Sequence, residues 1–563
     1  MRFLLVVILW FSVAASSLFG QQESALVPDQ IFYNGKIVTV DSANSIQEAF
    51  AVKGERFLAV GRNAEMRALG GPRTRLVDLR GHTVIPGLMD NHIHPFRYIS
   101  TILRGVDMTG VKSLAEMSNR IRQAAATAKP GQTIYATGRW SENDLAEKRP
   151  PTRQELDRLV PDRPVVVLQA LANAYLNTAA LKAARITRET KSLRGEPTSI
   201  PKDANGEPTG VIVGRGPIIL VVPRVVPMED LRELTLKVQH DLNALGFTSI
   251  REPDLPLEIM RLYYTLWREG KLTLRVSMGQ DVGPGEADDI EEILGPVGVG
   301  AGFGDHWLRV DSLGEFSVDG GERDQITSTV RTPEGQTVSL TANIGAEQFR
   351  HAVMAMNRYG WRPAPHVNGD KPLDLVLDGY EAADREKSIR DQRWIIEHSS
   401  MIRTDQMDRF ARLGVLVSAQ FQPYRGSENL IRTWGRERAE RAVPMREMLD
   451  HGLIVSAGSD WPGSTNNPFV PFYFYVTRKT ENGTLIGAAQ KISREEALRV
   501  STINNAYMTY DEKIKGSIGP EKLADFVILS QDILTVPEEQ IRSLQPLATY
   551  VGGQKVFSKE GGF

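Results

Sequence analysis

Residues 84–94 read Val-Ile-Pro-Gly-Leu-Met-Asp-Asn-His-Ile-His, an apolar run that ends in two histidines separated by one residue. On a strand, side chains at positions i and i+2 point to the same face, so the imidazoles of His92 and His94 are expected to lie side by side. Two neutral imidazoles at that spacing can bind one divalent metal ion. The stretch therefore predicts a strand that carries metal ligands at its end.

Three further polar residues follow apolar runs later in the chain. His366 comes directly after Pro-Ala-Pro, His398 ends the run Trp-Ile-Ile-Glu-His, and Asp460 ends the run Ile-Val-Ser-Ala-Gly-Ser-Asp. The carboxyl ends of the strands of an α/β barrel meet at one mouth. A lone His-x-His arises by chance, but this ordered set predicts a metal site at such a mouth. The other five histidines have helical or loop-like settings and are expected to be structural: His82, His240, His306, His351 and His451.

The pattern of the whole chain favours an α/β fold, a TIM (β/α)8 barrel with a small β-sandwich domain built from both termini. Residues 87–514 alternate short apolar runs with helical patterns, which is typical of parallel βα units. Residues 27–86 and 515–563 instead carry short strand-like segments with tight-turn signals, so they are expected to form the sandwich together. Insertions within the barrel are expected at about residues 140–225.

Composition excludes several classes of protein. The 563 residues exceed the size of one ordinary core, which agrees with two domains. Lysine plus arginine (67) nearly balance aspartate plus glutamate (69), and no basic block stands out, so a nucleic-acid partner is not expected. The chain has no cysteine, which excludes disulfides, thiolate zinc sites, iron–sulfur clusters and cysteine nucleophiles.

Residues 1–20 have the pattern of a secretory signal peptide. Met1 and Arg2 precede an apolar run of about 13 residues, followed by small residues and a polar stretch. The run is shorter than the roughly 20 residues that a membrane span needs. We therefore expect an exported protein, periplasmic or secreted, with no stable membrane span after signal removal; an uncleaved anchor helix is the alternative.

At the level of motifs, the chain resembles the amidohydrolase superfamily. Residues 86–94 look like its first-strand motif, and His366, His398 and Asp460 match its later strand-end ligands. More closely, it is similar to the branch containing N-substituted formamide deformylase and D-aminoacylase-like hydrolases. The segments that carry this likeness are 176–181, 206–210, 246–249, 319–320, 366–370, 396–398 and 457–460. The resemblance covers nearly everything after the signal segment and implies a metal-dependent barrel hydrolase.

The bridging position departs from the common pattern. Many members bridge two metals with a carboxylated lysine, which in this branch lies four residues before an Asp-Gly pair. Here Glu315 holds that place before Asp319, and no lysine occurs from 272 to 370. A glutamate offers two hard oxygens that can span two divalent ions, so Glu315 is the expected bridge. Asp311 is the reserve candidate, and a site with a single metal is the alternative.

The resemblance implies a metal site with six ligands: His92, His94, Glu315, His366, His398 and Asp460. His92 and His94 would bind one divalent ion, His366 and His398 the other, with Glu315 between them. Zinc suits such a set, with one or two ions bound. Asp460 would act as the catalytic general acid and base on a metal-activated water. Asp370 and Glu397 are expected to orient ligands.

Substrate contacts are harder to assign. Relatives often carry a histidine in the stretch that reads Ala-Leu-Ala-Asn-Ala-Tyr at 170–175, and this chain has none. Asn173, Tyr175, Trp140 and Arg323 are the candidate substrate-binding residues.

The expected reaction is hydrolysis of a C–N bond (amide, N-acyl, N-formyl or cyclic amide) in a small-molecule substrate. Three alternatives stay open: a mononuclear-metal deaminase, an esterase or lactonase, and a non-catalytic metal- or ligand-binding periplasmic protein. The sequence is compatible with a homo-oligomer.

Overall fold

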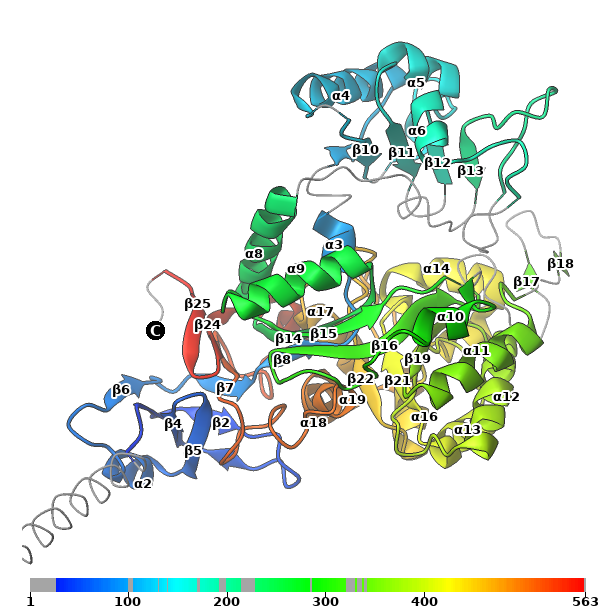
Figure 1. Ribbon diagram of the computed structural model, residues 1–563. Coiled ribbons are helices and arrows are strands. Elements are labelled where there is room, and N and C mark those ends of the chain that lie inside the picture. Colours follow the sequence, from blue (N-terminus) through cyan, green and yellow to red (C-terminus); the bar gives the residue numbers. More distant parts are fainter. Residues whose placement is uncertain are drawn as a thin grey trace, which may run out of the picture.

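The structure is a computed structural model that describes residues 27–99, 105–129, 131–138, 140–169, 173–191, 199–213, 228–283, 286–319, 330–331, 337–338, 342–560 and 563. Figure 1 shows three parts: a large barrel, a β-sandwich beside it and a smaller inserted unit. The expected signal peptide at 1–20 and the candidate Arg323 lie outside the described residues. Within those residues, no helix is both long and apolar enough to cross a membrane.

Eight parallel strands form the barrel, in the order β22-β21-β20-β19-β16-β15-β14-β8. They are β8 (Leu88–Asp90), β14 (Phe247–Leu255), β15 (Arg275–Gln280), β16 (Leu308–Ser317), β19 (Pro363–Val367), β20 (Ile395–His398), β21 (Leu416–Ala419) and β22 (Val455–Ala457). Backbone bonds join the ends of the first and last strands, because Asn91 N donates to Ala457 O and Asp460 N donates to His92 O. The barrel is thus nearly closed, and the predicted fold class is confirmed.

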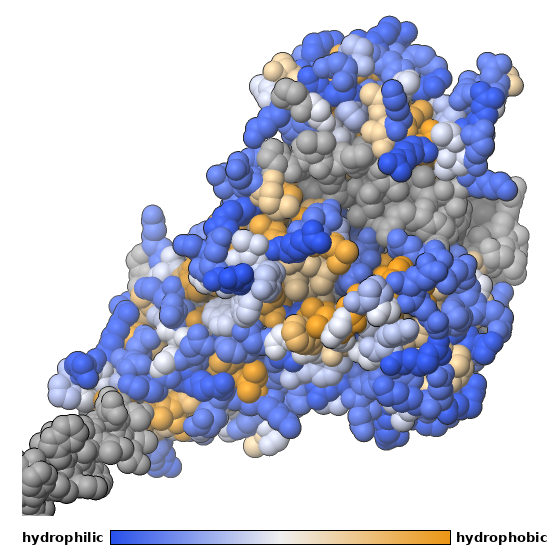
Figure 2. All heavy atoms as spheres, in the orientation of Figure 1, coloured by the Kyte–Doolittle hydropathy of each residue, from blue (hydrophilic) through white to orange (hydrophobic). Residues whose placement is uncertain are grey.

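Helices cover the outside of the barrel. They are α3 (Pro95–Tyr98), α8 (Met228–Ala244), α9 (Leu257–Arg268), α10 (Ile290–Leu294), α11 (Ala346–Arg358), α12 (Asp370–Glu386), α13 (Thr404–Leu413), α14 (Pro423–Trp434), α15 (Arg436–Glu440), α16 (Met445–Asp450), α17 (Phe469–Thr477), α18 (Arg494–Ser501) and α19 (Ile503–Met508). Helix α11 shows why they form: Phe349, Val353 and Met356 recur at helical spacing and are all buried against the barrel. The opposite faces are charged, and Figure 2 shows a mainly hydrophilic surface there.

The β-sandwich combines strands from both ends of the chain. One sheet has the order β25 (Gln554–Ser558), β24 (Pro546–Val551), β23 (Phe526–Leu529), β7 (Thr83–Pro86), β2 (Lys36–Val38) and β3 (Ile46–Gln47); the other has β5 (Arg56–Gly61), β4 (Ala49–Lys53), β1 (Gln30–Tyr33) and β6 (Arg75–Asp78), with α2 (Asn63–Ala68) beside it. The antiparallel pairing of β23 with β7 joins the two terminal segments. Aromatic rings fill the space between the sheets, with Phe526 stacked on Tyr550 at 4.5 Å and Phe32 on Phe50 at 4.9 Å.

The inserted unit is larger than the sequence indicated. Its five-stranded sheet has the order β13 (Val211–Val213), β12 (Asn173–Leu176), β11 (Val165–Gln169), β10 (Ile134–Thr137) and β9 (Val106–Asp107), with α4 (Leu114–Thr127), α5 (Arg153–Leu159) and α6 (Thr178–Ala183). The unit therefore begins near 106 and not near 140. Because β9, β10 and β11 are parallel and α4 lies between β9 and β10, their sequence pattern is that of barrel units.

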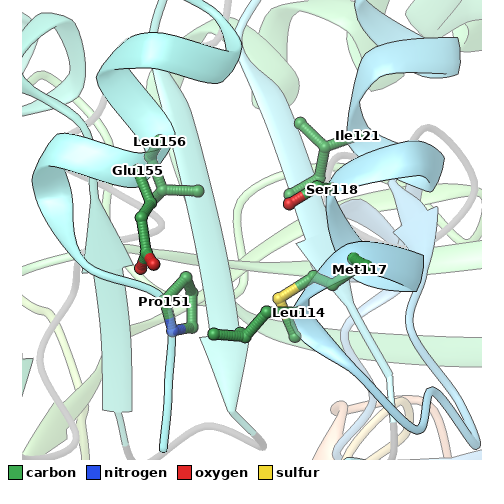
Figure 3. Close-up of a pocket in the computed structure, with 8 residues that line it drawn as sticks. Leu114, Met117, Ser118, Ile121, Pro151, Glu155 and Leu156 are labelled. Carbon is green, nitrogen blue, oxygen red and sulfur yellow. The ribbon is translucent and has the colours of Figure 1, made fainter. Parts of the chain in front are cut away.

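A small open pocket of about 150 Å³ lies between α4 and α5 of this unit. Apolar side chains line it together with the polar residues Ser118 and Glu155 (Figure 3). Figure 1 places the unit above α8 and α9, and Lys129 of the unit pairs with Asp230 of α8 at 3.1 Å.

A buried ion pair ties the barrel to the sandwich. Arg275 of β15 donates two hydrogen bonds, at 2.7 and 2.8 Å, to the carboxylate of Asp525, which directly precedes β23. Both side chains are almost fully buried, and the guanidinium also lies 4.3 Å from the ring of Trp307.

We expect Asp525→Asn to lower the free energy of unfolding by about 3–5 kcal/mol, because the buried guanidinium of Arg275 loses its counter-ion. Urea unfolding measures the change. The control is Arg436→Gln, which breaks the exposed pair with Glu440 and should cost no more than about 1 kcal/mol. Equal losses in the two variants would contradict the role given to the buried pair.

Candidate metal centre

Six side chains from five barrel strand ends meet at one point. They are His92 and His94 after β8, Glu315 of β16, His366 of β19, His398 of β20 and Asp460 after β22. Three overlapping groups of them have ligand atoms that all lie within 4.8 Å of one another: His92, His94 and Glu315; Glu315, His366 and His398; and His92, His398 and Asp460. The structure thus brings together all the ligands that the sequence suggested.

The carboxylate of Glu315 lies between two pairs of histidines. Its Oε1 is 2.5 Å from His366 Nδ1 and 2.8 Å from His398 Nε2, while Oε2 is 3.4 Å from His92 Nε2 and 3.6 Å from His94 Nε2. Burial opposes the ionisation of Glu315, but the neighbouring imidazoles of His92 and His366 hold its pKa well below the ordinary value. One oxygen faces each pair, which is what a bridging ligand requires.

Asp460 is the most exposed member of the group, with 21% of its side chain accessible, whereas His92 and His94 are fully buried. Its Oδ1 lies 3.4 Å from His94 Nε2. Although burial opposes ionisation, the hydrogen bond with His94 and the charges of nearby imidazoles lower the pKa of Asp460. The carboxylate can therefore meet a molecule that enters the mouth.

Two of the six residues have a strained backbone. His398 has φ 71° and Asp460 has φ 54°, in the left-handed region that non-glycine residues rarely adopt. Such conformations cost of order 1–3 kcal/mol and persist only where the surrounding structure enforces them. At Asp460 the enforcing contacts include the backbone bond to His92 O and the hydrogen bond that Trp461 N donates to Ser459 Oγ.

Outer contacts orient three of the imidazoles. The Nδ1–H of His92 donates to Glu397 Oε2 at 2.7 Å, that of His94 to Asp254 Oδ1 at 2.6 Å, and that of His398 to Gln420 Oε1 at 2.6 Å. Each bond engages Nδ1 and directs Nε2 to the centre, the arrangement typical of metal-binding histidines. His366 is reversed: its Nδ1 faces Glu315, and its Nε2 lies 3.1 Å from the side-chain amide of Asn368.

The donor set fits a divalent metal ion. The Nε2 atoms of His92 and His94 lie 3.2 Å apart. Two nitrogens that each lie 2.0–2.1 Å from one tetrahedral zinc ion are about 3.3 Å from each other, so this spacing fits two ligands of one ion. Imidazole and carboxylate donors together suit zinc and other divalent transition metals.

Charged partners lie beneath the site. Asp311, the reserve candidate for the bridge, is not a ligand: it is fully buried and pairs with Arg251 and Arg362. Glu397 contacts His92 and not its sequence neighbour His398. Burial would raise the pKa of Glu397, but the charges of Arg251 and His92 lower it to about 2.

The loop after His366 is fixed by the Asp-Gly motif that marked the bridging position. Asp319 accepts hydrogen bonds from Asn368 N at 2.8 Å and Gly369 N at 2.7 Å, which holds the start of α12. Asp370 begins that helix, and Arg403 Nη1 lies 3.4 Å from its carboxylate.

The candidate substrate residues of the inserted unit lie within its own packing. Trp140 and Tyr175 are buried with ring centroids 5.9 Å apart, and Trp140 Nε1 donates to Leu168 O at 2.8 Å. Asn173 Nδ2 and the Tyr175 hydroxyl both donate to Gln169 Oε1, at 3.1 and 3.0 Å. Contact of these three residues with substrate stays a prediction.

The sequence reasoning missed Asp254, Gln420, Arg97 and Arg251. The stretch Arg-Glu-Pro-Asp at 251–254 follows the apolar run 247–250, so charged residues at a strand end were the available signal. Gln420 likewise follows the run of β21.

Comparisons with known proteins agree with this geometry. A family model described as the amidohydrolase family matches residues 75–557. The chain is 29% identical over 555 residues to N-substituted formamide deformylase of Arthrobacter pascens, covering 95% of this chain and 99% of that protein. It is 27% identical over 559 residues to protein LONG AFTER FAR-RED 3 of Arabidopsis thaliana, covering 95% and 92%. An uncharacterized metal-dependent hydrolase from Pyrococcus horikoshii OT3 has the same fold, with a TM-score of 0.73, 23% identity and coverage of 91% and 99%.

A buried acid beside the site predicts a pH dependence of stability. Glu252 of β14 is 1% exposed and accepts hydrogen bonds from Phe96 N at 2.6 Å and the Tyr263 hydroxyl at 3.0 Å. Burial, with the nearby charge of Asp254, raises its pKa from 4.5 to about 8. The folded protein therefore keeps a proton that the unfolded chain releases between these values, so this contribution to stability falls as the pH rises from about 4.5 to 8.

Glu252→Gln keeps an oxygen that accepts from Phe96 N, can donate its amide N–H to the Tyr263 hydroxyl oxygen, and cannot titrate. Measured by urea unfolding with metal removed by a chelator, the variant should gain stability relative to the wild type as the pH rises from 5 to 8. Parallel pH profiles for the two proteins would contradict the raised pKa.

Proposed function

The chain belongs to the amidohydrolase family, as its strand-end motifs predicted, and from this membership we propose that it hydrolyses a C–N bond of a small molecule at a divalent metal centre. The observation that carries the proposal is Glu315, whose two oxygens face separate histidine pairs beside the partly exposed carboxylate of Asp460. The bond proposed is an amide, with N-formyl and N-acyl amines as the first substrate class and cyclic amides as the next. The similarity to a protein named N-substituted formamide deformylase, over almost the full length of both chains, supports that order.

We assign the metal ligands by the geometry of the two histidine pairs. His92 and His94 would hold one ion with Glu315 Oε2, and His366 and His398 the other with Oε1; zinc is the proposed metal. When bound, such ions lower the pKa of a water molecule to about 7 and polarise a carbonyl group. The protein side chains fix the positions of these ions, because three of the imidazoles are themselves held by outer hydrogen bonds.

Asp460 would move the proton during the reaction. Its lowered pKa keeps the carboxylate ionised at neutral pH, which a proton acceptor requires. A carboxylate at this position can take a proton from the attacking water and then deliver it to the leaving nitrogen. Its partial exposure at the mouth gives Asp460 access to the water and to the leaving nitrogen, whereas the fully buried His92 has no such access.

A second candidate is a hydrolytic deaminase with one metal. The group of His92, His398 and Asp460 favours it, since these ligand atoms could hold a single ion without Glu315. Ester or lactone hydrolysis would use the same residues. A protein that binds metal but hydrolyses none of these substrates would support the non-catalytic alternative.

Glu315→Gln keeps the size of the side chain and removes the charge that would hold two cations together. We expect bound metal to fall toward one equivalent and hydrolysis to fall at least about 10-fold. Metal analysis of the purified protein and a panel of N-formyl and N-acyl amines provide the two readouts. The control is Glu347→Gln, at an exposed position of α11. Full metal content and wild-type turnover in Glu315→Gln would rule out the bridge and favour the deaminase.

Asp460→Asn tests the proton transfer separately from the bridge. The amide cannot carry the proton, so we expect turnover of the best substrate in the panel to fall by about 10²–10⁴-fold, while the His92–His94 and His366–His398 pairs keep their metal. Turnover near the wild-type level with metal retained would show that another group moves the proton.

A further inference from the structure

Two histidines of the site are each held by a series of hydrogen-bonded side chains, a carboxylate followed by an arginine. Behind His92, Glu397 Oε2 accepts the Nδ1 proton, and Arg251 Nη1 lies 2.6 Å from the other oxygen of Glu397. Arg251 continues to Asp311, and all of these side chains are fully buried. This series of side chains is buried inside the barrel.

The series of side chains behind His94 also consists of a carboxylate and an arginine, but it is less buried. Asp254 Oδ1 accepts the Nδ1 proton of His94 at 2.6 Å, and Arg97 Nη2 donates to the other oxygen, Oδ2. The side chain of Asp254 is 11% exposed and that of Arg97 is 27% exposed. This second series of side chains therefore reaches the mouth of the barrel.

The short helix α3 places Arg97 for this contact. The helix starts directly after His94, so Arg97 lies one turn from the histidine whose partner it binds. Strand β14 holds the helix at two points, since Glu252 accepts from Phe96 N and Asp254 pairs with Arg97. The imidazole, the helix and the strand end are thus fixed to one another.

We propose that Asp254 and Arg97 are positioning residues of the metal centre, with Asp254 holding the His94 imidazole so that Nε2 faces the metal and Arg97 holding Asp254. Among the described residues, His94 binds Oδ1 of Asp254 and Arg97 binds Oδ2, so loss of Arg97 would leave the carboxylate able to rotate away from His94. The proposal rests on the metal site proposed above. Arg97 could instead bind an anionic group of the substrate, but its pairing with Asp254 favours the positioning role.

The test is zinc affinity, measured on the full chain by competition with a chelator. Asp254→Asn and Arg97→Gln should each weaken zinc binding by about 10–100-fold, the range for lost support of a metal ligand. Arg97→Lys keeps a cation and should restore most of the affinity. The visible spectrum of the cobalt-loaded protein should also change in Asp254→Asn, because the orientation of His94 is altered.

The matched control is Asp511→Asn, which breaks a buried ion pair of Asp511 with Arg309 and Lys515. This variant should lose stability without losing zinc affinity. Wild-type affinity and an unchanged cobalt spectrum in Asp254→Asn would overturn the inference. Wild-type zinc affinity in Arg97→Gln, with a raised KM for N-formyl amino acids but not for neutral N-formyl amines, would also overturn it and make Arg97 a substrate anchor. If the wild-type protein binds no zinc, the proposed function itself fails.

Discussion

The metal site depends on one buried cation, the guanidinium of Arg251. It donates to Asn91 O at 3.1 Å and to Ser312 Oγ at 2.9 Å, and it pairs with Asp311 and Glu397. These contacts connect β14 to β16, to β20 and to Asn91, which follows β8. A charge buried without partners costs several kcal/mol, so the two carboxylates cannot be lost without loss of stability. Glu397, fixed in this way, in turn fixes His92.

This arrangement explains why polar residues occupy the interior of the barrel. An apolar layer at this level would pack equally well, but it would leave the histidines without partners to orient them. The buried ion pairs join β14 to β16 and β20, and the imidazoles above them are oriented by Glu397, Asp254 and Gln420. The site is therefore held in place by the barrel itself and not by its loops.

The sequence predicted those features that follow from position along a strand. His92, His94, His366, His398 and Asp460 each end an apolar run, and the ends of parallel strands must meet in a closed barrel. Contacts across strands could not be predicted in this way. Glu397 was expected to orient a ligand, but the sequence did not say which one. Adjacent residues on a strand point to opposite faces, so Glu397 contacts His92 and not its neighbour His398. The start of the inserted unit was missed because its parallel strands have the same pattern as those of the barrel.

The proposed bridge between two metal ions is Glu315. Anomalous X-ray diffraction at the zinc absorption edge, from crystals of the zinc-loaded protein, can locate the ions. We expect two peaks about 3.5–4 Å apart, the usual spacing of two-metal sites, one beside His92 and His94 and the other beside His366 and His398, with Glu315 between them. A single peak, or peaks that do not contact Glu315, would contradict it.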